Sequence, residues 1–232
     1  MEIRLRVRKA FLALDKYLWF QKTKEQASAG RILDVGGGEG LFEALFQRPD
    51  QQATILEVSA DNKKLAGNAD YVVYGGETFP FRNQCFDVGM ALQTLEHVPP
   101  QFRQCVVAEM VRVVKKQIIF AFPTRRLHFE RLFKILFALY AIIGLPKMKR
   151  YYEEHLRYGL PRPELVSAFV GRAPTSSESY FGRLSCLILL IQLVFPILLP
   201  LSAFFARTIG KLNDREPVFT LLRWDRQMTE DN

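Results

Sequence analysis

The segment RILDVGGGEGLFEALF, residues 31–46, places four glycines within five residues between an apolar run and an amphipathic one. Residues 31–35 have the composition of a buried parallel strand, and residues 41–46 repeat apolar side chains at helical spacing. Glycines at such a strand-to-helix turn remove Cβ atoms, permit positive φ and let a ligand approach the backbone closely. The segment therefore predicts a ligand-binding turn in an α/β fold.

The spacing of the glycines narrows the kind of turn. A phosphate-binding P-loop needs Lys followed by Ser or Thr after its last glycine, and no such pair follows Gly40. The third glycine of the dinucleotide fingerprint GxGxxG would fall on Leu41. The chain instead has an acidic residue followed by alternate glycines, namely Asp34, Gly36, Gly38 and Gly40, with Gly37 inside the bend. A tight loop without a ligand is the alternative.

A second buried strand is predicted over residues 53–58, ATILEV, and it carries Glu57 near its end. Glu57 follows Asp34 at a distance typical of the acidic residue that binds ribose hydroxyls in nucleotide-binding α/β units. An ionised carboxylate accepts two O–H bonds with good geometry, which makes Glu57 the ribose candidate. The alternative is a glutamate that faces solvent at the end of a strand.

Further strands are predicted at residues 70–75, 85–92 and 117–122, with an amphipathic helix at residues 101–114. Strands that alternate with helices predict an α/β fold with a doubly wound, mostly parallel sheet and right-handed crossovers. In such sheets the ligand crevice lies at the carboxyl ends of the strands.

The composition sets broader bounds. With 232 residues, 49% hydrophobic and 24% charged, the chain fits one globular domain. The net charge of +8 suits a nucleic acid, an anionic ligand or an anionic membrane surface. The three cysteines show no CxxC or Cys/His spacing, so we expect neither disulfides nor a metal site, and we expect a reducing, cytoplasmic location. Asp15 and Lys16 interrupt the first apolar run, which argues against a signal peptide.

Four blocks of sequence together suggest a family. The blocks ILDVGGGEG, LEVS, FPFRNQCFDVGMALQTLEHV and MVRVVKKQIIFAFP resemble, in order and spacing, the class I S-adenosylmethionine-dependent methyltransferases. The likeness is strongest to the branch in which Pro-Phe precedes a Phe-Asp-Val strand, and it runs from about residue 31 to residue 123. The resemblance implies a Rossmann-like methyltransferase fold, S-adenosylmethionine as cofactor and methyl transfer as the activity.

The resemblance also implies roles for particular residues. The backbone of residues 36–40 would hold the methionine part of the cofactor, with Asp34 supporting the loop or the cofactor amino group. Glu57 would bind the ribose, and Val58 would line the adenine pocket. Two positions depart from the family pattern. Gly75 stands where an Asp usually binds the adenine amino group, so Glu77 or backbone carbonyls are candidates there, and KKQ replaces the Gly-Gly turn that usually precedes the fifth strand.

Two histidines are candidates for acid–base chemistry. His97, in the segment LEHVPP just after the fourth strand, has an unperturbed pKa near neutrality and would stand where the acceptor binds. Glu96 beside it would orient the ring or cap a helix. His155 lies in the segment YYEEHLRYGLP, residues 151–161, which could close over the pocket. The alternatives are that Glu96 and His97 only shape their loop and that residues 151–161 are a solvated loop.

The chain divides into three parts. Residues 1–28 form an N-terminal amphipathic helical segment, residues 29–123 the cofactor-binding core, and residues 124–232 the acceptor side. The last part contains apolar helices at 132–146 and 184–206 and a closing strand at 217–226, expected to be antiparallel at the sheet edge. Residues 184–206 carry no charge, but prolines at 196 and 200 predict a hairpin or a broken helix rather than one straight span.

Basic residues flank these apolar stretches, a pattern typical of contact with anionic lipid. We therefore expect a methyltransferase at the cytoplasmic membrane face, bound peripherally or through a hairpin at 184–206, that acts on a small or lipid-linked acceptor. The alternative to membrane contact is that both apolar stretches pack on the sheet as ordinary core helices. The alternative to an enzyme is a nonenzymatic binding or assembly protein. No nucleic acid is expected, because the Asn/Asp-Pro-Pro-Tyr/Phe sequence of base methyltransferases is missing after the fourth strand.

Overall fold

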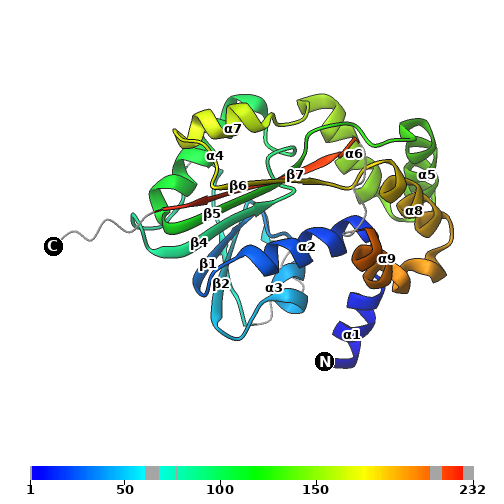
Figure 1. Cartoon of the computed structure of the whole chain (residues 1–232), viewed down its shortest axis with the longest axis horizontal. Helices are drawn as coiled ribbons and strands as arrows, with labels where there is room; N and C mark the ends of the chain where they lie inside the picture. The colour runs from blue at the N-terminus through cyan, green and yellow to red at the C-terminus, as the bar shows by residue number, and fades with distance from the viewer. Residues whose placement is uncertain (1, 61–67, 77, 210–215, 227–232) are drawn as a thin grey trace.

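A computed structural model describes residues 2–60, 68–76, 78–209 and 216–226. In these residues the strands form one sheet in the order β3-β2-β1-β4-β5-β7-β6 (Figure 1). The strands are β1 Gly30–Val35, β2 Gln51–Glu57, β3 Asp70–Val73, β4 Phe86–Leu92, β5 Val114–Pro123, β6 Ser176–Tyr180 and β7 Phe219–Asp225. The first five are parallel to one another, and β7 is antiparallel to both of its neighbours. The predicted doubly wound, mostly parallel sheet is confirmed.

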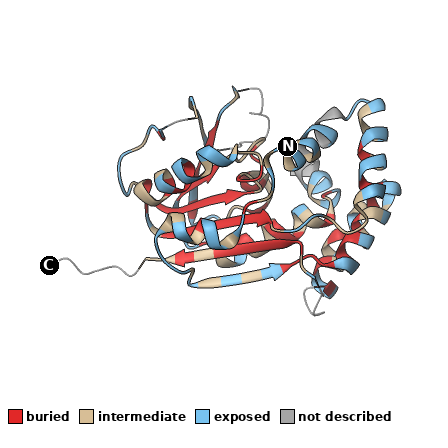
Figure 2. Ribbon diagram, turned by 90° about the horizontal axis from the view of Figure 1, so that it is seen from above, coloured by how far each residue is buried: buried red, intermediate tan, exposed pale blue. Residues whose placement is uncertain are grey.

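Helices cover both faces of the sheet (Figure 2). They are α1 Glu2–Ala10, α2 Leu14–Gln26, α3 Leu41–Phe46, α4 Pro100–Val113, α5 Glu130–Ile142, α6 Pro146–Tyr158, α7 Pro163–Val170, α8 Arg183–Val194, the 3₁₀ helix η2 Pro196–Leu201, and α9 Ser202–Ile209. Residues of α2, α3, α5, α8 and α9 share one hydrophobic core, while α4 and α7 contribute to the other. Alternate β5 residues supply the two cores, which is the period-two pattern of a strand buried on both faces.

The C-terminal strand pairs differently from the expectation. The segment expected at 217–226 forms β7, but β7 lies between β5 and β6 rather than at the sheet edge. The edge is β6, Ser176–Tyr180, for which the sequence gives almost no signal. Its residues SSESY have one buried side chain, because an edge strand with one partner does not need an apolar run.

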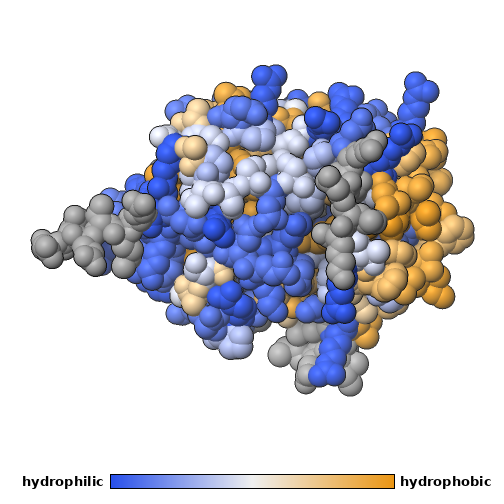
Figure 3. Space-filling view, viewed as in Figure 1, coloured by the Kyte–Doolittle hydropathy of each residue, from blue (hydrophilic) through white to orange (hydrophobic). Residues whose placement is uncertain are grey.

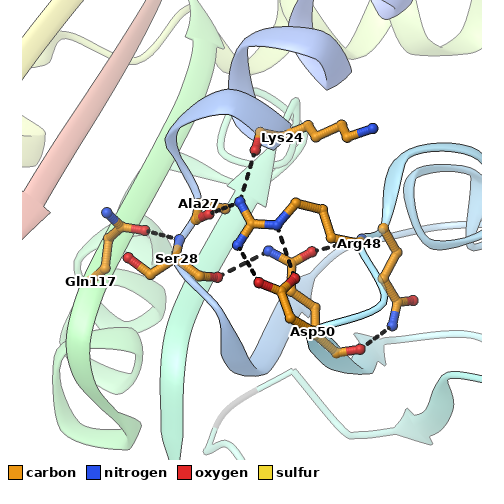
Figure 4. Close-up of polar contacts among 8 residues, drawn as sticks. Lys24, Ala27, Ser28, Arg48, Asp50 and Gln117 are labelled. Atoms are coloured by element: carbon orange, nitrogen blue, oxygen red, sulfur yellow. Dashed lines mark hydrogen bonds and ion pairs between the residues drawn. The ribbon is translucent and has the colours of Figure 1, made fainter.

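A polar network holds the end of the sheet at which the parallel strands begin (Figure 4). Arg48 donates to the carbonyl of Ala27 at 2.8 Å and forms an ion pair with Asp50, with Nε 3.0 Å from Oδ1. Gln117 accepts from the Ser28 N–H at 2.9 Å. These contacts join the end of α2 to the starts of β2 and β5. The KKQ segment belongs to the same end of the sheet, since it begins β5 rather than forming a turn before it.

The apolar segment 184–206 is broken, as its prolines predict. Helix α8 ends at Val194, Pro196 begins η2, and α9 starts at Ser202. Across the part of the chain that the structure describes, no helix combines the length and the apolar character needed to cross a bilayer.

Candidate active site

The glycine bend follows β1 at the point where the strand order reverses, between β1 and β4. Gly36, with φ 72°, donates its N–H to the Leu56 carbonyl at 2.8 Å, and a Cβ on it would lie 2.7 Å from Thr94 Oγ1. Gly38 has φ 58°, and a Cβ there would meet nothing within 4 Å. One side of the bend is therefore packed against Thr94, in the loop after β4, while the other is bare, which suits a ligand that rests on the backbone.

Three carboxyl groups lie close to this bend. Asp34, at 2% exposure, is so near that a Cβ on Gly37 would lie 2.6 Å from its Oδ2. Burial raises the pKa of Asp34 well above its usual value, and the nearby charges of Glu43 and Glu57 raise that pKa further. Burial also raises the pKa of Glu43, in α3, to about 7. Acidic groups gathered under a bare backbone favour a ligand that carries positive charge.

Tyr71, in β3, was not predicted from the sequence. Its O–H lies 3.2 Å from the Gly38 carbonyl and 3.1 Å from the Ser59 carbonyl, so the ring joins the glycine bend to the segment after β2. Burial and the charge of Glu57 raise the pKa of Tyr71 to about 12, which keeps the hydroxyl protonated. Its only sequence signal is an aromatic residue in a short strand, which is usually a packing residue.

The ribose and adenine candidates lie at the ends of β2 and β3. Glu57 is buried at the carboxyl end of β2, while Val58 is 62% exposed. Beyond β3, Cβ atoms on Gly75 and Gly76 would meet nothing within 4 Å, so this side is open. Glu77 lies outside the described residues. Asp34, the glycine bend and Glu57 thus lie together at the carboxyl ends of β1 and β2. The residues present fit a cofactor with a cationic methionine part and a ribose.

The two candidate histidines meet although they are far apart in sequence. His97 Nε2 and His155 Nε2 are 3.4 Å apart, and the ring centroids are 4.8 Å apart. His97 Nδ1 lies 2.7 Å from Glu154 Oε2. Glu96 is fully buried beside them, and its carboxylate oxygens have no hydrogen-bond partner among the described residues. This His–Glu cluster, Glu96, His97, Glu154 and His155, joins the loop after β4 to helix α6.

Burial sets the protonation of the cluster. It lowers the pKa of His155 to about 4, with the His97 charge as a second cause, and it lowers the pKa of His97 against the opposing effect of Glu154. Burial raises the pKa of Glu96 to about 8, although its own backbone N–H and Arg103 act in the opposite direction. Both imidazoles are therefore neutral at physiological pH, the state in which a ring nitrogen can accept a proton.

Arg103, also absent from the sequence predictions, holds α6 in place. From α4 it donates to the Tyr158 carbonyl at 3.2 Å and to the Gly159 carbonyl at 2.6 Å, and its Nε donates to Val98 at 3.0 Å. It therefore ties the end of α6 to the loop that follows His97. Residues 151–158, for which a solvated loop was the alternative, are part of this helix.

Among the described strands, β7 is the one that runs antiparallel to the others. A doubly wound sheet of this kind, with a glycine bend beside buried carboxyl groups, is typical of the class I methyltransferase fold. Residues 33–122 match a family model described as a methyltransferase domain. They form a class I, S-adenosylmethionine-dependent methyltransferase domain, as the resemblance implied.

Curated relatives agree with this assignment. The chain is 35% identical over 104 residues to an uncharacterized methyltransferase of Mycobacterium sp. (strain JLS), with 42% of this chain and 40% of that protein covered. It is 29% identical over 151 residues to the ubiquinone/menaquinone biosynthesis C-methyltransferase UbiE of Stutzerimonas stutzeri, covering 55% of this chain and 57% of that protein. The chain thus spans about two fifths of the mycobacterial relative and under two thirds of the other.

Solved structures show the same fold. A methyltransferase of Thermotoga maritima described as a possible histamine N-methyltransferase superposes with a TM-score of 0.56 at 16% identity, covering 95% of this chain and 90% of that one. Phosphoethanolamine N-methyltransferase 2 of Haemonchus contortus, solved with S-adenosyl-L-methionine, gives a TM-score of 0.54 at 13% identity, covering 91% of this chain and 52% of that one.

Proposed function

We propose that this protein transfers a methyl group from S-adenosylmethionine to a hydrophobic, lipid-linked acceptor at an anionic membrane surface. The observation that carries the methyl-transfer part is the glycine bend. The Gly38 position is bare, and buried carboxyl groups lie close to the bend, an arrangement that supports binding of a cationic sulfonium cofactor.

When bound, S-adenosylmethionine supplies an electrophilic methyl group, so the protein has mainly to align the acceptor with it. Alignment and exclusion of water account for about 7–11 kcal/mol of a reaction barrier in favourable cases. We assign the cofactor to the backbone of residues 36–40 with Asp34, Glu57 and Val58 around it. Thr94 supports the bend from below, since its hydroxyl donates to the Val35 carbonyl at 2.8 Å.

We assign the acceptor to the carboxyl end of β4, beside the His–Glu cluster. A neutral His97 ring can take a proton from an oxygen, nitrogen or activated carbon acceptor, and Glu154 stabilises the charged ring that results. His155 is the second candidate base. The position of both rings in the loop and helix beside β4 supports this assignment.

The acceptor class is inferred from an exposed apolar surface. We define the apolar surface as a set of exposed side chains from α5, α8, η2 and α9, with Phe195 between α8 and η2: Leu132, Ile135, Leu139, Ile142, Leu184, Leu187, Ile191, Val194, Phe195, Ile197, Leu201 and Phe204. Figure 3 shows hydrophobic residues gathered at the end of the molecule where α5, α8 and α9 lie in Figure 1. Ile197, at 82% exposure, is among the most exposed. A surface this apolar is typical of a membrane or partner contact.

Exposed basic residues accompany this surface and favour anionic lipid as its occupant. They are Arg125, Arg131, Arg183 and Arg207. The relative whose name refers to ubiquinone and menaquinone biosynthesis supports a hydrophobic acceptor.

Methyl transfer is tested by supplying the protein with isotope-labelled S-adenosylmethionine and a total lipid extract. The expected result is micromolar cofactor binding by calorimetry and label in a lipid fraction, with the mass gain of one CH2 group. Absence of cofactor binding at millimolar concentration would instead support a nonenzymatic binding protein. Label found only in water-soluble compounds would contradict the lipid-linked acceptor but not the enzyme class.

Membrane contact is expected to depend on lipid charge. Changing Arg125, Arg131, Arg183 and Arg207 to Gln should lower affinity for phosphatidylglycerol vesicles about tenfold, since each basic residue near an anionic surface contributes up to about 1 kcal/mol before screening. Cosedimentation with vesicles measures this. The control is Arg82→Gln with Arg172→Gln, two exposed residues outside the helices that carry the apolar surface. Equal binding to phosphatidylcholine and phosphatidylglycerol vesicles by the unchanged protein would contradict the proposal.

A further inference from the structure

We propose that Glu96, His97 and His155 form a binding site for a divalent transition-metal ion of the zinc type, between the loop after β4 and helix α6. The three residues can each offer one donor atom, and these atoms lie within 4.8 Å of one another. The cysteine pattern predicted no metal site, and the two histidines are 58 residues apart in sequence. A metal on His97 Nε2 would use the same lone pair that the general-base role needs, so metal and proton compete for that nitrogen. Metal binding is nevertheless tested separately from methyl transfer, because it is measured without cofactor or acceptor.

The separation of the two histidine nitrogens matches a shared metal. Their Nε2 atoms are 3.4 Å apart. In a tetrahedral zinc site with metal–nitrogen bonds of about 2.0–2.1 Å, two nitrogen ligands are about 3.3–3.4 Å apart. The histidine pair therefore needs little adjustment to hold one ion. Glu96 must move closer by a change of side-chain torsion, since no two ligands of one such ion lie more than about 4.2 Å apart.

Glu154 prepares His97 for this role. Its Oε2 lies 2.7 Å from His97 Nδ1, so we assign the proton of the neutral ring to Nδ1. The Nε2 lone pair then faces His155. A carboxylate that accepts from the far nitrogen of a histidine is the usual outer partner of a metal-ligating histidine, because it fixes the tautomer and the ring orientation.

Glu96 gives the second, independent indication. Its side chain is fully buried, and neither carboxylate oxygen has a hydrogen-bond partner among the described residues. Arg103 is nearby, but it donates to the carbonyls of Val98, Tyr158 and Gly159 instead. A buried carboxyl group without a partner is unfavourable, and binding of a cation, with release of its proton, removes that cost.

The donor set selects the kind of metal. Two imidazole nitrogens and one carboxylate oxygen are typical of catalytic zinc and of ferrous iron, whereas magnesium and calcium prefer oxygen ligands only. Three protein ligands also leave a coordination position open. At this end of β4 that position would bind water or an oxygen of the acceptor.

The experiment uses the full chain without a polyhistidine tag, freed of metal by dialysis against a chelator. Calorimetric titration with Zn²⁺ is expected to show one saturable site, which Mg²⁺ does not fill. Glu96→Gln and His155→Gln should each lower the Zn²⁺ affinity by more than tenfold, and Glu154→Gln by about 10–100-fold. The matched control is His128→Gln, since His128 is the remaining histidine of the chain and lies outside the cluster.

A Co²⁺ titration of the unchanged protein gives a second readout that needs no variant. Visible absorption of a four- or five-coordinate ion without a thiolate charge-transfer band supports the site. A thiolate band would place the metal on the cysteines and overturn the proposal. Unchanged Zn²⁺ affinity in folded Glu96→Gln and His155→Gln would also overturn it, and so would the absence of saturable binding. The two histidines would then be a hydrogen-bonded pair only.

Discussion

Replacing Gly38 with arginine is expected to abolish cofactor binding while the chain still folds. The Cβ at this position meets nothing within 4 Å, so the new side chain extends into open space without a clash. It must occupy the bare side of the bend, where we place the methionine part of the cofactor. It also adds a positive charge beside a ligand that is itself cationic. We expect the cofactor Kd to rise by more than 100-fold, a loss of about 3 kcal/mol or more.

The backbone contributes a smaller effect that needs its own control. Gly38 has φ 58°, and a non-glycine residue in this region costs about 1–2 kcal/mol of stability. Gly171, with φ 81° and equally open space, ends α7 and precedes the edge strand β6. Gly171→Arg should therefore show the stability loss in thermal unfolding and keep cofactor binding in calorimetry. Retained cofactor affinity in folded Gly38→Arg would contradict the assignment of the bend.

The cofactor part of the site could be predicted because its residues directly follow strands that the sequence pattern predicts. The glycine bend and Glu57 directly end buried strands, and parallel strands bring those ends to one edge whatever the rest of the chain does. Continuous apolar runs predicted the strands β1, β2, β4 and β5. Strand β6 was missed because pairing with β7, not its composition, makes SSESY a strand.

The His–Glu cluster depends on tertiary packing that no local sequence pattern predicts. His97 and His155 were each candidates, but their contact requires α6 to lie across the loop after β4. Arg103 holds α6 there by donating to backbone carbonyls. Because every residue has such a carbonyl, no residue type in the sequence predicts the contact. Tyr71 was missed for a similar reason, since its partners are the carbonyls of Gly38 and Ser59.

Glu43→Gln is expected to remove much of the pH dependence of stability. Burial raises the pKa of Glu43 in the folded protein to about 7, from 4.5 for an unperturbed glutamate. Between these values the folded protein binds more protons than the unfolded chain, so the free energy of unfolding falls as pH rises toward 7 and levels off above it. A shift of this size costs about 3 kcal/mol once Glu43 is fully ionised. Asp34 acts with the same sign, because its pKa is also raised.

The glutamine variant cannot ionise, so it should match the unchanged protein at pH 5 and exceed it by about 2–3 kcal/mol at pH 8. Urea unfolding without cofactor at the two pH values measures this. Glu25→Gln, a change at an exposed residue of α2, is the control and should leave the pH dependence as it was. Cofactor binding should respond in the opposite sense. Ionised Glu43 attracts the sulfonium, so the Kd of the unchanged protein falls as pH rises through 7, and Glu43→Gln flattens that trend. An equal pH dependence of unfolding in the two proteins would mean that Glu43 is already ionised at pH 5.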